Sequence, residues 1–299
     1  MFLPRKILEE KLQNMLAEDV GQGDITTALI VPDGSTAEAE VMAKESGVAA
    51  GIGEAKILLE CLGLKAEALV ADGEKIKTKQ VLLKIFGDTR TILSVERTLL
   101  NILSRMSGIA TNTRRLIEKI REAKIKTKVA CTRKTAPGLL HFDKKAVLIG
   151  GGDPHRFHLD DMILIKDNHI AMAGSIEKAL KKVRENASFS KKIEVEVSKI
   201  EDVLAAAKAG TDIIMLDNFP PKQIERAVRL LKKTGFFGKV LLEVSGGITA
   251  ENVLQFASTE IDIVSLGEIT DSTKALDINL KITKTRKTGK PRFKMQANL

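Results

Sequence analysis

Short β-branched segments alternate with helical patterns through the second half of the chain. The segments are rich in Val, Ile and Leu, and they lie at 162–166, 193–197, 213–216, 240–244 and 261–266. Between them, apolar residues recur every three or four positions over 176–184, 200–209, 224–233 and 250–257, which is the pattern of one helix face. Strands that alternate with helices form a parallel sheet. Repeats of this length favour an open or incomplete parallel β/α barrel, similar to a TIM barrel, over a doubly wound sheet.

Polar residues and glycines end or follow these predicted strands. With a further strand predicted at 125–131, the set is Thr132, Arg133, Lys134, Lys166, Glu196, Asp217, Ser245, Gly246, Gly247, Gly267 and Glu268. In β/α barrels the carboxyl ends of the strands share one face, and active sites lie there. We therefore expect the set to meet at one mouth. Each glycine alone would be typical of a turn, and each charged residue alone of a surface ion pair.

The residue types in this set suit a phosphorylated substrate. A glycine between a strand and a helix allows backbone N–H groups to approach a phosphate, so the glycines and Ser245 are candidate phosphate contacts. Glu196 and Asp217 are candidate contacts for a Mg²⁺ ion that keeps its waters and bridges substrate phosphates. The cations from the early strands would face a second anionic group.

The segment GGGDPHR at 150–156 is a predicted loop. It carries His155 and Arg156, two donors suited to a carboxylate, which an Arg can bind through two hydrogen bonds. His158 and His169 lie near them in the sequence, but no helical spacing and no Cys support a zinc site. We therefore interpret His155 and Arg156 as anion-binding residues rather than metal ligands.

Charge and composition exclude several classes of protein. The formal net charge is +9, and six of these charges lie in a basic C-terminal tail at 283–299, which contains the second of two TRKT sequences. Phe293 is the tail's only aromatic residue, so a solvated tail is favoured over a nucleic-acid-binding module. The N-terminal segment resembles neither a signal peptide nor a membrane span, and Cys61 and Cys131 lack the spacing of a disulfide framework. We expect a cytoplasmic globular protein without membrane partners.

The chain is long enough for more than one domain, because single cores stop growing at about 250–300 residues. Residues 1–107 have their own patterns, a strand at 36–43, a helix at 52–61 and a strand at 81–86, and are predicted to form a separate N-terminal α/β domain. Residues 108–282 are predicted to form the catalytic barrel domain. Residues from about 271 to 282 are candidates to return to the N-terminal domain.

Several motifs in order resemble one enzyme family, quinolinate phosphoribosyltransferase, also called carboxylating nicotinate-nucleotide pyrophosphorylase. The motifs are TRKT-x-PG at 132–138, GGG-x-x-HR at 150–156, LIKDNH at 164–169, EVEV at 194–197, LDNF at 216–219 and EVSGGI at 243–248. GDITT at 23–27 and ERTLLNILSRMSGIAT at 96–111 extend the likeness. No single motif is decisive, but together they cover nearly all of the chain except the basic tail.

The resemblance implies a reaction and a set of roles. The family transfers the phosphoribosyl group of phosphoribosyl pyrophosphate to the ring nitrogen of quinolinate and removes the 2-carboxylate, giving nicotinate mononucleotide, CO₂ and pyrophosphate. It implies quinolinate contacts from Arg97, Thr132, Arg133, Lys134, His155, Arg156 and Lys166. Contacts to phosphoribosyl pyrophosphate are implied for Lys134, Glu196, Asp217, Ser245, Gly246, Gly247, Gly267 and Glu268, and catalytic roles for Lys134, Glu196 and Asp217.

The resemblance also implies an assembly and a cofactor. Arg97 is expected to come from a neighbouring subunit, so the functional unit is a homodimer or a higher even-numbered oligomer with shared active sites. The N-terminal domain is expected to be an α/β sandwich that covers the partner's barrel mouth. Mg²⁺ accompanies phosphoribosyl pyrophosphate, with Glu196 and Asp217 contacting it through water and substrate, and no organic cofactor is implied.

Two alternatives stay open within the enzyme class. Relatives often carry a hydrophobic residue and then Arg after PG, whereas this chain has Leu139, Leu140 and His141. A paralogue that uses another acceptor, including a related pyridine acid, therefore stays possible, unless His141 substitutes for the missing cation. A Schiff-base aldolase could use Lys166 at a strand end, but the number of cations around it favours anion binding.

Overall fold

The computed structural model describes residues 3–286, and these form two compact units. The first runs to Thr111 and resumes at Lys274, and the second is Asn112–Thr273. The boundary falls within the long helix α4 (Thr89–Glu122), which contains the whole of the motif at 96–111. Among the described residues, no helix is both long enough and apolar enough to cross a bilayer.

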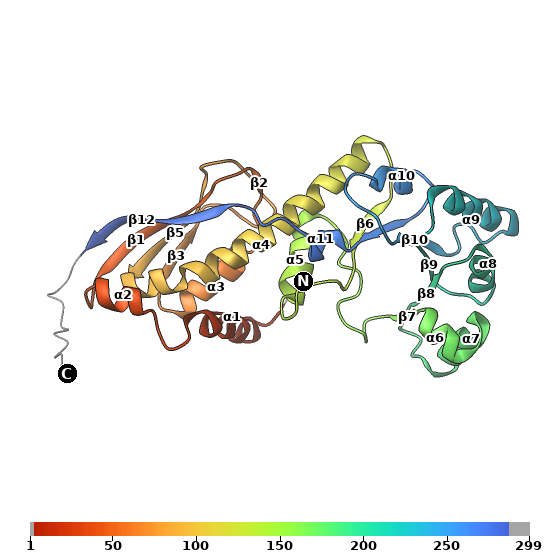
Figure 1. The fold of residues 1–299 in the computed structure, drawn as a ribbon, viewed down its shortest axis with the longest axis horizontal. Coiled ribbons are helices and arrows are strands. Elements are labelled where there is room, and N and C mark those ends of the chain that lie inside the picture. Colours follow the sequence, from red (N-terminus) through yellow and green to blue (C-terminus); the bar gives the residue numbers. More distant parts are fainter. Residues whose placement is uncertain (1–2, 287–299) are drawn as a thin grey trace, which may run out of the picture. The chain divides into compact units, whose positions relative to one another are not determined.

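The first unit is built on an antiparallel sheet with the strand order β12-β1-β5-β3. Its strands are β1 (Thr36–Ala43), β3 (Lys65–Ala68), β5 (Val81–Asp88) and β12 (Ile278–Arg286), and β2 (Gly47–Val48) pairs separately with β4 (Lys75–Ile76). Side chains alternate between exposed and buried along β1, as in a sheet with one covered face. The helices α1 (Arg5–Val20), α2 (Ile25–Ile30) and α3 (Ile52–Cys61) lie on one side of this sheet (Figure 1).

The second unit contains a parallel sheet of six strands in the order β6-β11-β10-β9-β8-β7. Its strands are β6 (Lys128–Cys131), β7 (Ile163–Ile165), β8 (Ile193–Val197), β9 (Ile213–Asp217), β10 (Leu241–Ser245) and β11 (Ile263–Leu266). The connecting helices are α5 (Leu140–Gly150), α6 (Asp167–Ala173), α7 (Ile176–Asn186), α8 (Ile200–Lys208), α9 (Pro221–Thr234), α10 (Val253–Ala257) and α11 (Glu268–Asp271). Because β6 and β7 are the two edges, the sheet is not closed. The predicted incomplete parallel β/α barrel is confirmed.

The segment 150–156 is more ordered than the predicted loop. Asp153 forms a parallel bridge with Ala130 of β6. The Asp153 N–H donates to the carbonyl of Val129 at 2.8 Å, and the Cys131 N–H donates to the carbonyl of Asp153 at 3.1 Å. A short stretch of extended chain therefore lies along the outer edge of β6. The predicted loop therefore has one fixed point on β6, where Asp153 pairs with Ala130, and Gly150 belongs to α5 instead.

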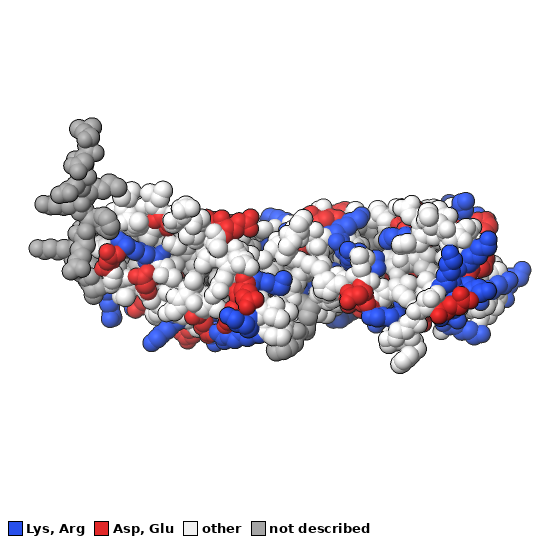
Figure 2. Space-filling view, turned by 90° about the horizontal axis from the view of Figure 1, so that it is seen from below, with Lys and Arg blue, Asp and Glu red and all other residues white. Residues whose placement is uncertain are grey.

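The chain returns to the first unit after α11. β12 pairs antiparallel with β1 from Ala43 opposite Ile278 to Thr36 opposite Arg286. Residues 283–286 of the predicted tail therefore belong to a strand, and the remainder of the tail lies outside the described residues. On the face drawn in Figure 2, basic and acidic side chains are interspersed rather than segregated by sign.

Candidate active site

A pocket of about 620 Å³ lies at the carboxyl ends of the parallel strands of the second unit. It is lined by thirteen of the residues singled out from the sequence: Thr132, Arg133, Lys134, His155, Arg156, Lys166, Glu196, Asp217, Ser245, Gly246, Gly247, Gly267 and Glu268. They follow different strands and are separated by up to 136 positions in the chain (268 − 132). Parallel pairing brings them together, because it aligns the carboxyl ends of all strands at one edge.

Arg97 is the one predicted site residue that does not line this pocket. It belongs to the first unit, where it lines a separate groove together with Asp19, Asp24 and Ser94. Asp24 lies in the GDITT motif and caps α2 by accepting from the N–H of Thr27 at 2.9 Å. Arg97 and GDITT, two motifs far apart in the sequence, therefore meet at one surface of the first unit.

Cations occupy one side of the pocket. Arg133 and Lys134 follow β6, and the carbonyl oxygen of Lys134 accepts a hydrogen bond from the buried hydroxyl of Thr270 at 2.7 Å. Arg156 is only 8% exposed. Its pKa is lowered by burial and by the positive charge of Arg133. A bound anion would favour the charged form of Arg156, which burial and Arg133 disfavour.

Two predicted carboxylates also line the pocket, Glu196 and Asp217. Glu196 is the last residue but one of β8 and forms an ion pair with Lys166, which follows β7. Asp217 ends β9, lies beside Ser245 in register, and accepts a hydrogen bond from the side chain of Asn218 at 2.8 Å. Carboxylate oxygens are the ligands that Mg²⁺ prefers in proteins. Asp217 has no cation paired with it in the described structure, whereas Glu196 is already paired with Lys166, so Asp217 fits a Mg²⁺ contact better than Glu196 does.

A turn with left-handed backbone follows β10. Gly246 and Gly247 have φ values of 96° and 62°, a region that other residues rarely adopt. A Cβ atom on Gly246 would collide with the side chain and backbone of Asn218, whose N–H donates to the carbonyl of Ser245 at 2.9 Å. Space around Gly247 is open. The turn therefore presents bare backbone to the pocket.

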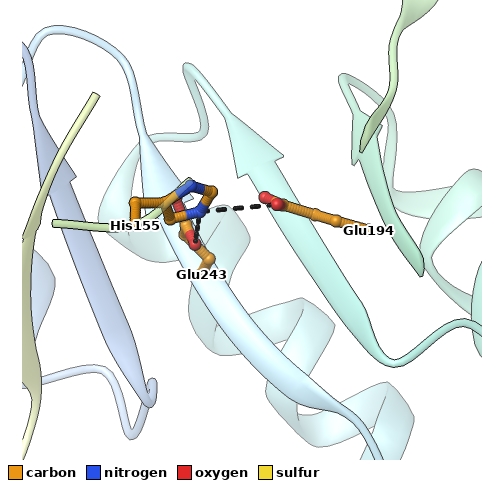
Figure 3. Close-up of side chains that lie close together, drawn as sticks. All are labelled: His155, Glu194 and Glu243. Carbon is orange, nitrogen blue, oxygen red and sulfur yellow. Dashed lines mark hydrogen bonds and ion pairs between the residues drawn. The ribbon is translucent and has the colours of Figure 1, made fainter. Parts of the chain in front are cut away.

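His155 lies close to two carboxylates, those of Glu194 and Glu243 (Figure 3), and His155 and Glu243 line the pocket. The Nε2 atom of His155 lies 3.1 Å from Oε2 of Glu243 on β10 and 3.4 Å from Oε2 of Glu194 on β8. Both glutamates are fully buried. Burial lowers the pKa of His155, but the two carboxylates outweigh it and raise the pKa to about 10. The ring is therefore a fixed imidazolium near neutral pH.

These three residues also have the spacing of a metal site, since their ligand atoms lie within 4.8 Å of one another. A metal ligand must be a neutral imidazole. The high pKa of His155 makes loss of its proton costly near neutral pH. In the described structure the two carboxylates hold the ring as an imidazolium.

Sequence reasoning missed Glu194 and Glu243 as site residues. A signal was present, because each lies two positions before a predicted site residue, Glu196 or Ser245, and alternate residues of a strand share a face. Asn218, Ser265 and Asp271 also line the pocket without having been predicted. Cys131 lines it too, but it is fully buried and burial raises the pKa of its thiol, which suits a core residue better than a nucleophile.

Known proteins share these features along almost the entire chain. Residues 109–281 match the quinolinate phosphoribosyl transferase C-terminal domain, and residues 24–107 match the N-terminal domain of the same family. The chain is 46% identical over 277 residues to a probable carboxylating nicotinate-nucleotide pyrophosphorylase of Methanocaldococcus jannaschii, covering 91% of this chain and 96% of the relative. It is 35% identical over 282 residues to the carboxylating nicotinate-nucleotide pyrophosphorylase of Homo sapiens, covering 94% of each.

Solved structures give the same result. NadC from Streptococcus pyogenes matches with a TM-score of 0.87 at 37% identity, covering 96% of this chain and 99% of that chain. The nicotinate-nucleotide pyrophosphorylase from Francisella tularensis matches with a TM-score of 0.85 at 36% identity, covering 94% and 98%. Since both domain families match in order and the relatives span the same length, the chain belongs to the quinolinate phosphoribosyl transferase family.

Proposed function

We propose that the protein transfers the phosphoribosyl group of phosphoribosyl pyrophosphate to the ring nitrogen of quinolinate. Decarboxylation then gives nicotinate mononucleotide, CO₂ and pyrophosphate, a step of NAD biosynthesis. The observation that carries this proposal is the single pocket in which cations, carboxylates and a glycine turn meet at the strand ends of a family member. Such a pocket can hold a dicarboxylate beside a phosphorylated sugar.

The cationic side is assigned to the acceptor. Thr132, Arg133, Lys134, His155, Arg156 and Lys166 would surround the two carboxylates of quinolinate. His155 suits this role because its ring stays positively charged, with Nε2 directed at Glu243. The 5′-phosphate of the donor would be contacted by the 245–247 turn, which consists of Ser245 and two glycines, and by Gly267 and Glu268.

Transfer requires stabilisation of a positively charged sugar. As pyrophosphate leaves, the bond from ribose C1 to oxygen breaks with its electron pair on oxygen, and the ribose gains oxocarbenium character. Glu196 would stabilise that charge once Lys166 turns from Glu196 toward a substrate carboxylate, while Lys134 would hold the leaving pyrophosphate. Mg²⁺, bound beside Asp217 through water and substrate, would supply charge neutralisation for the pyrophosphate.

Decarboxylation then follows from the charge of the product ring. The alkylated nitrogen is cationic, so the bond from ring C2 to its carboxylate can break with the electron pair left on C2. CO₂ departs, and C2 accepts a proton. The protein's task is to position the ring and balance its charge, so no protein nucleophile is required.

The proposal extends to assembly and location. Arg97 would reach the quinolinate of a neighbouring subunit, which makes a homodimer or a higher even-numbered oligomer the functional unit. The GDITT motif, which shares the groove of Arg97, would belong to the same shared surface. The protein is assigned to the cytoplasm, without nucleic-acid or membrane partners. The aldolase alternative is disfavoured because Lys166 forms an ion pair with Glu196 and lines the pocket with Arg133, Lys134 and Arg156, a set suited to anions.

The proposed function is tested by incubating the protein with Mg²⁺, phosphoribosyl pyrophosphate and either quinolinate or nicotinate. Nicotinate mononucleotide and CO₂ in equal amounts are expected with quinolinate only. Product from nicotinate without CO₂ would overturn the acceptor assignment. In the same assay, Lys134→Ala is expected to lower kcat/KM by about 100-fold or more. Arg286→Ala, in the second TRKT, is the matched control and should retain the wild-type rate.

A further inference from the structure

A buried lysine behind the pocket takes no part in the reaction described above. Lys144 lies on α5, and its side chain is fully buried. Its ammonium donates to the carbonyl oxygen of Pro154 and, at 3.0 Å, to the carbonyl oxygen of Arg156. Within the described residues these bonds go to backbone rather than to a carboxylate. Burying an ammonium in this way is costly, so its presence requires a reason.

The two carbonyl groups lie on either side of His155. This residue has a φ of 54°, in the left-handed region. A residue other than glycine persists there only where its surroundings hold it. Asp153 supplies part of that support, since its carboxylate accepts from the His155 N–H at 2.7 Å while its backbone pairs with the edge of β6. Lys144 supplies the other part, from the helix that precedes the segment.

The backbone of this turn determines where two site residues point. The ring of His155 is held by Glu243, with Nε2 and Oε2 3.1 Å apart. Arg156, the next residue, is buried and lines the pocket. Without Lys144, the carbonyls of Pro154 and Arg156 would lose their donor. The turn could then relax to a more ordinary conformation, and both the imidazolium and the guanidinium would move.

We propose that Lys144 is a positioning residue, whose buried ammonium bonds the carbonyls on either side of His155 and so holds the strained turn that presents His155 and Arg156 to the acceptor. The part of this inference that concerns the acceptor rests on the proposed function. The part that concerns the conformation of His155 does not.

Two further observations agree with this assignment. Burial lowers the pKa of Lys144, but the Cys131 side chain and the charge of Asp153 oppose that shift and favour the ammonium. The Cys131 thiol, 3.5 Å from the carbonyl of Pro154, contacts the same turn from β6. A helix, an edge strand and an Asp side chain thus converge on three consecutive residues.

The test compares Lys144→Met, which keeps the length of the side chain and removes its donors, with Lys144→Gln, which retains donors without the charge. Lys181→Met, at an exposed position of α7, is the matched control. Because the chain has only four histidines, ring ¹H–¹⁵N spectra can follow His155 directly, with its signal assigned through His155→Gln.

In Lys144→Met the His155 ring signal is expected to shift or broaden while far-UV circular dichroism is retained. The KM for quinolinate should rise about tenfold, and the KM for phosphoribosyl pyrophosphate should change less than about twofold. Lys144→Gln should show a smaller effect in the same direction, and Lys181→Met none.

An unchanged His155 signal in a folded Lys144→Met or Lys144→Gln variant would overturn the inference. Equal increases in both KM values, together with a lower melting temperature, would indicate a purely structural role and would overturn it too. If wild type does not turn over quinolinate, the proposed function fails, while the ring spectra still decide the role of Lys144. If Lys144→Met does not fold, Lys144→Gln and its spectra decide.

Discussion

At the scale of single residues, His155 shows how buried charges balance at the base of the pocket. Its ring contacts Glu243 and Glu194, and Arg156 follows it in the chain. Burial raises the pKa of Glu194, and the contact with His155 opposes that rise. The imidazolium therefore faces two buried carboxylates, and the positive charge of Arg156 also lowers the pKa of Glu194. Loss of either partner would leave a buried charge without compensation.

This balance predicts how stability depends on pH. The folded-state pKa of His155, about 10, lies above the unfolded value of about 6.5. The folded protein thus binds the extra proton, and its stabilisation is complete below the unfolded pKa and lost as pH rises through the folded pKa. Between pH 7 and pH 9 we expect wild type to lose about 2 kcal/mol more unfolding free energy than His155→Gln. Urea unfolding of both proteins measures this, and parallel pH profiles would contradict it.

At the scale of elements, the turn after β10 depends on two adjacent glycines in different surroundings. Gly246 and Gly247 both have positive φ values. A Cβ on Gly246 would meet Asn218, whereas a Cβ on Gly247 would meet nothing within 4 Å. Backbone strain affects both positions, but steric overlap affects only the first. Substitutions at the two glycines therefore distinguish the effect of backbone strain from the effect of steric overlap.

Alanine at each glycine is expected to give different costs. Gly247→Ala should lower the unfolding free energy by about 1 kcal/mol, from backbone strain alone. Gly246→Ala should lower it by about 2–4 kcal/mol, because Asn218 must also move. It should also raise the KM for phosphoribosyl pyrophosphate more than Gly247→Ala does. Chemical denaturation and steady-state kinetics check both expectations, and equal destabilisation by the two variants would refute the steric explanation.

At the scale of the whole molecule, the last described strand of the chain, β12, belongs to the first unit. The sheet of that unit includes β12, which pairs with β1 over its full length although more than 230 residues separate them (Figure 1). Ile278 of β12 and Leu276 just before it are buried. Such late pairing covers an edge that would otherwise expose unpaired backbone groups.

Two truncations test this role of β12. A variant that ends at Arg286 should keep the stability and activity of wild type, because β12 is retained. A variant that ends at Asp277 lacks β12 and should lose several kcal/mol of stability or fail to accumulate as soluble protein. Thermal unfolding followed by circular dichroism distinguishes them. Equal melting temperatures would show that the strand does not contribute to the first unit.

The sequence alone was sufficient to predict the incomplete parallel barrel and most of the residues that line its pocket. Local periodicity identifies strands and helices, and a parallel sheet must align its carboxyl ends, so residues as distant as Lys134 and Gly267 could be assigned to one pocket. The match of predicted and observed helix at Ile52–Cys61 has the same local origin.

Only the tertiary structure decided which groups lie behind that mouth. Glu243 meets His155 across 88 positions of the chain, and Lys144 reaches two particular carbonyls. The return of residues 271–282 was predicted, but the antiparallel register of β12 on β1 was not. No local pattern encodes such contacts. They depend on which faces of distant elements pack together. The resulting burial and contacts then determine the charge of His155 and the free-energy cost of burying the Lys144 ammonium.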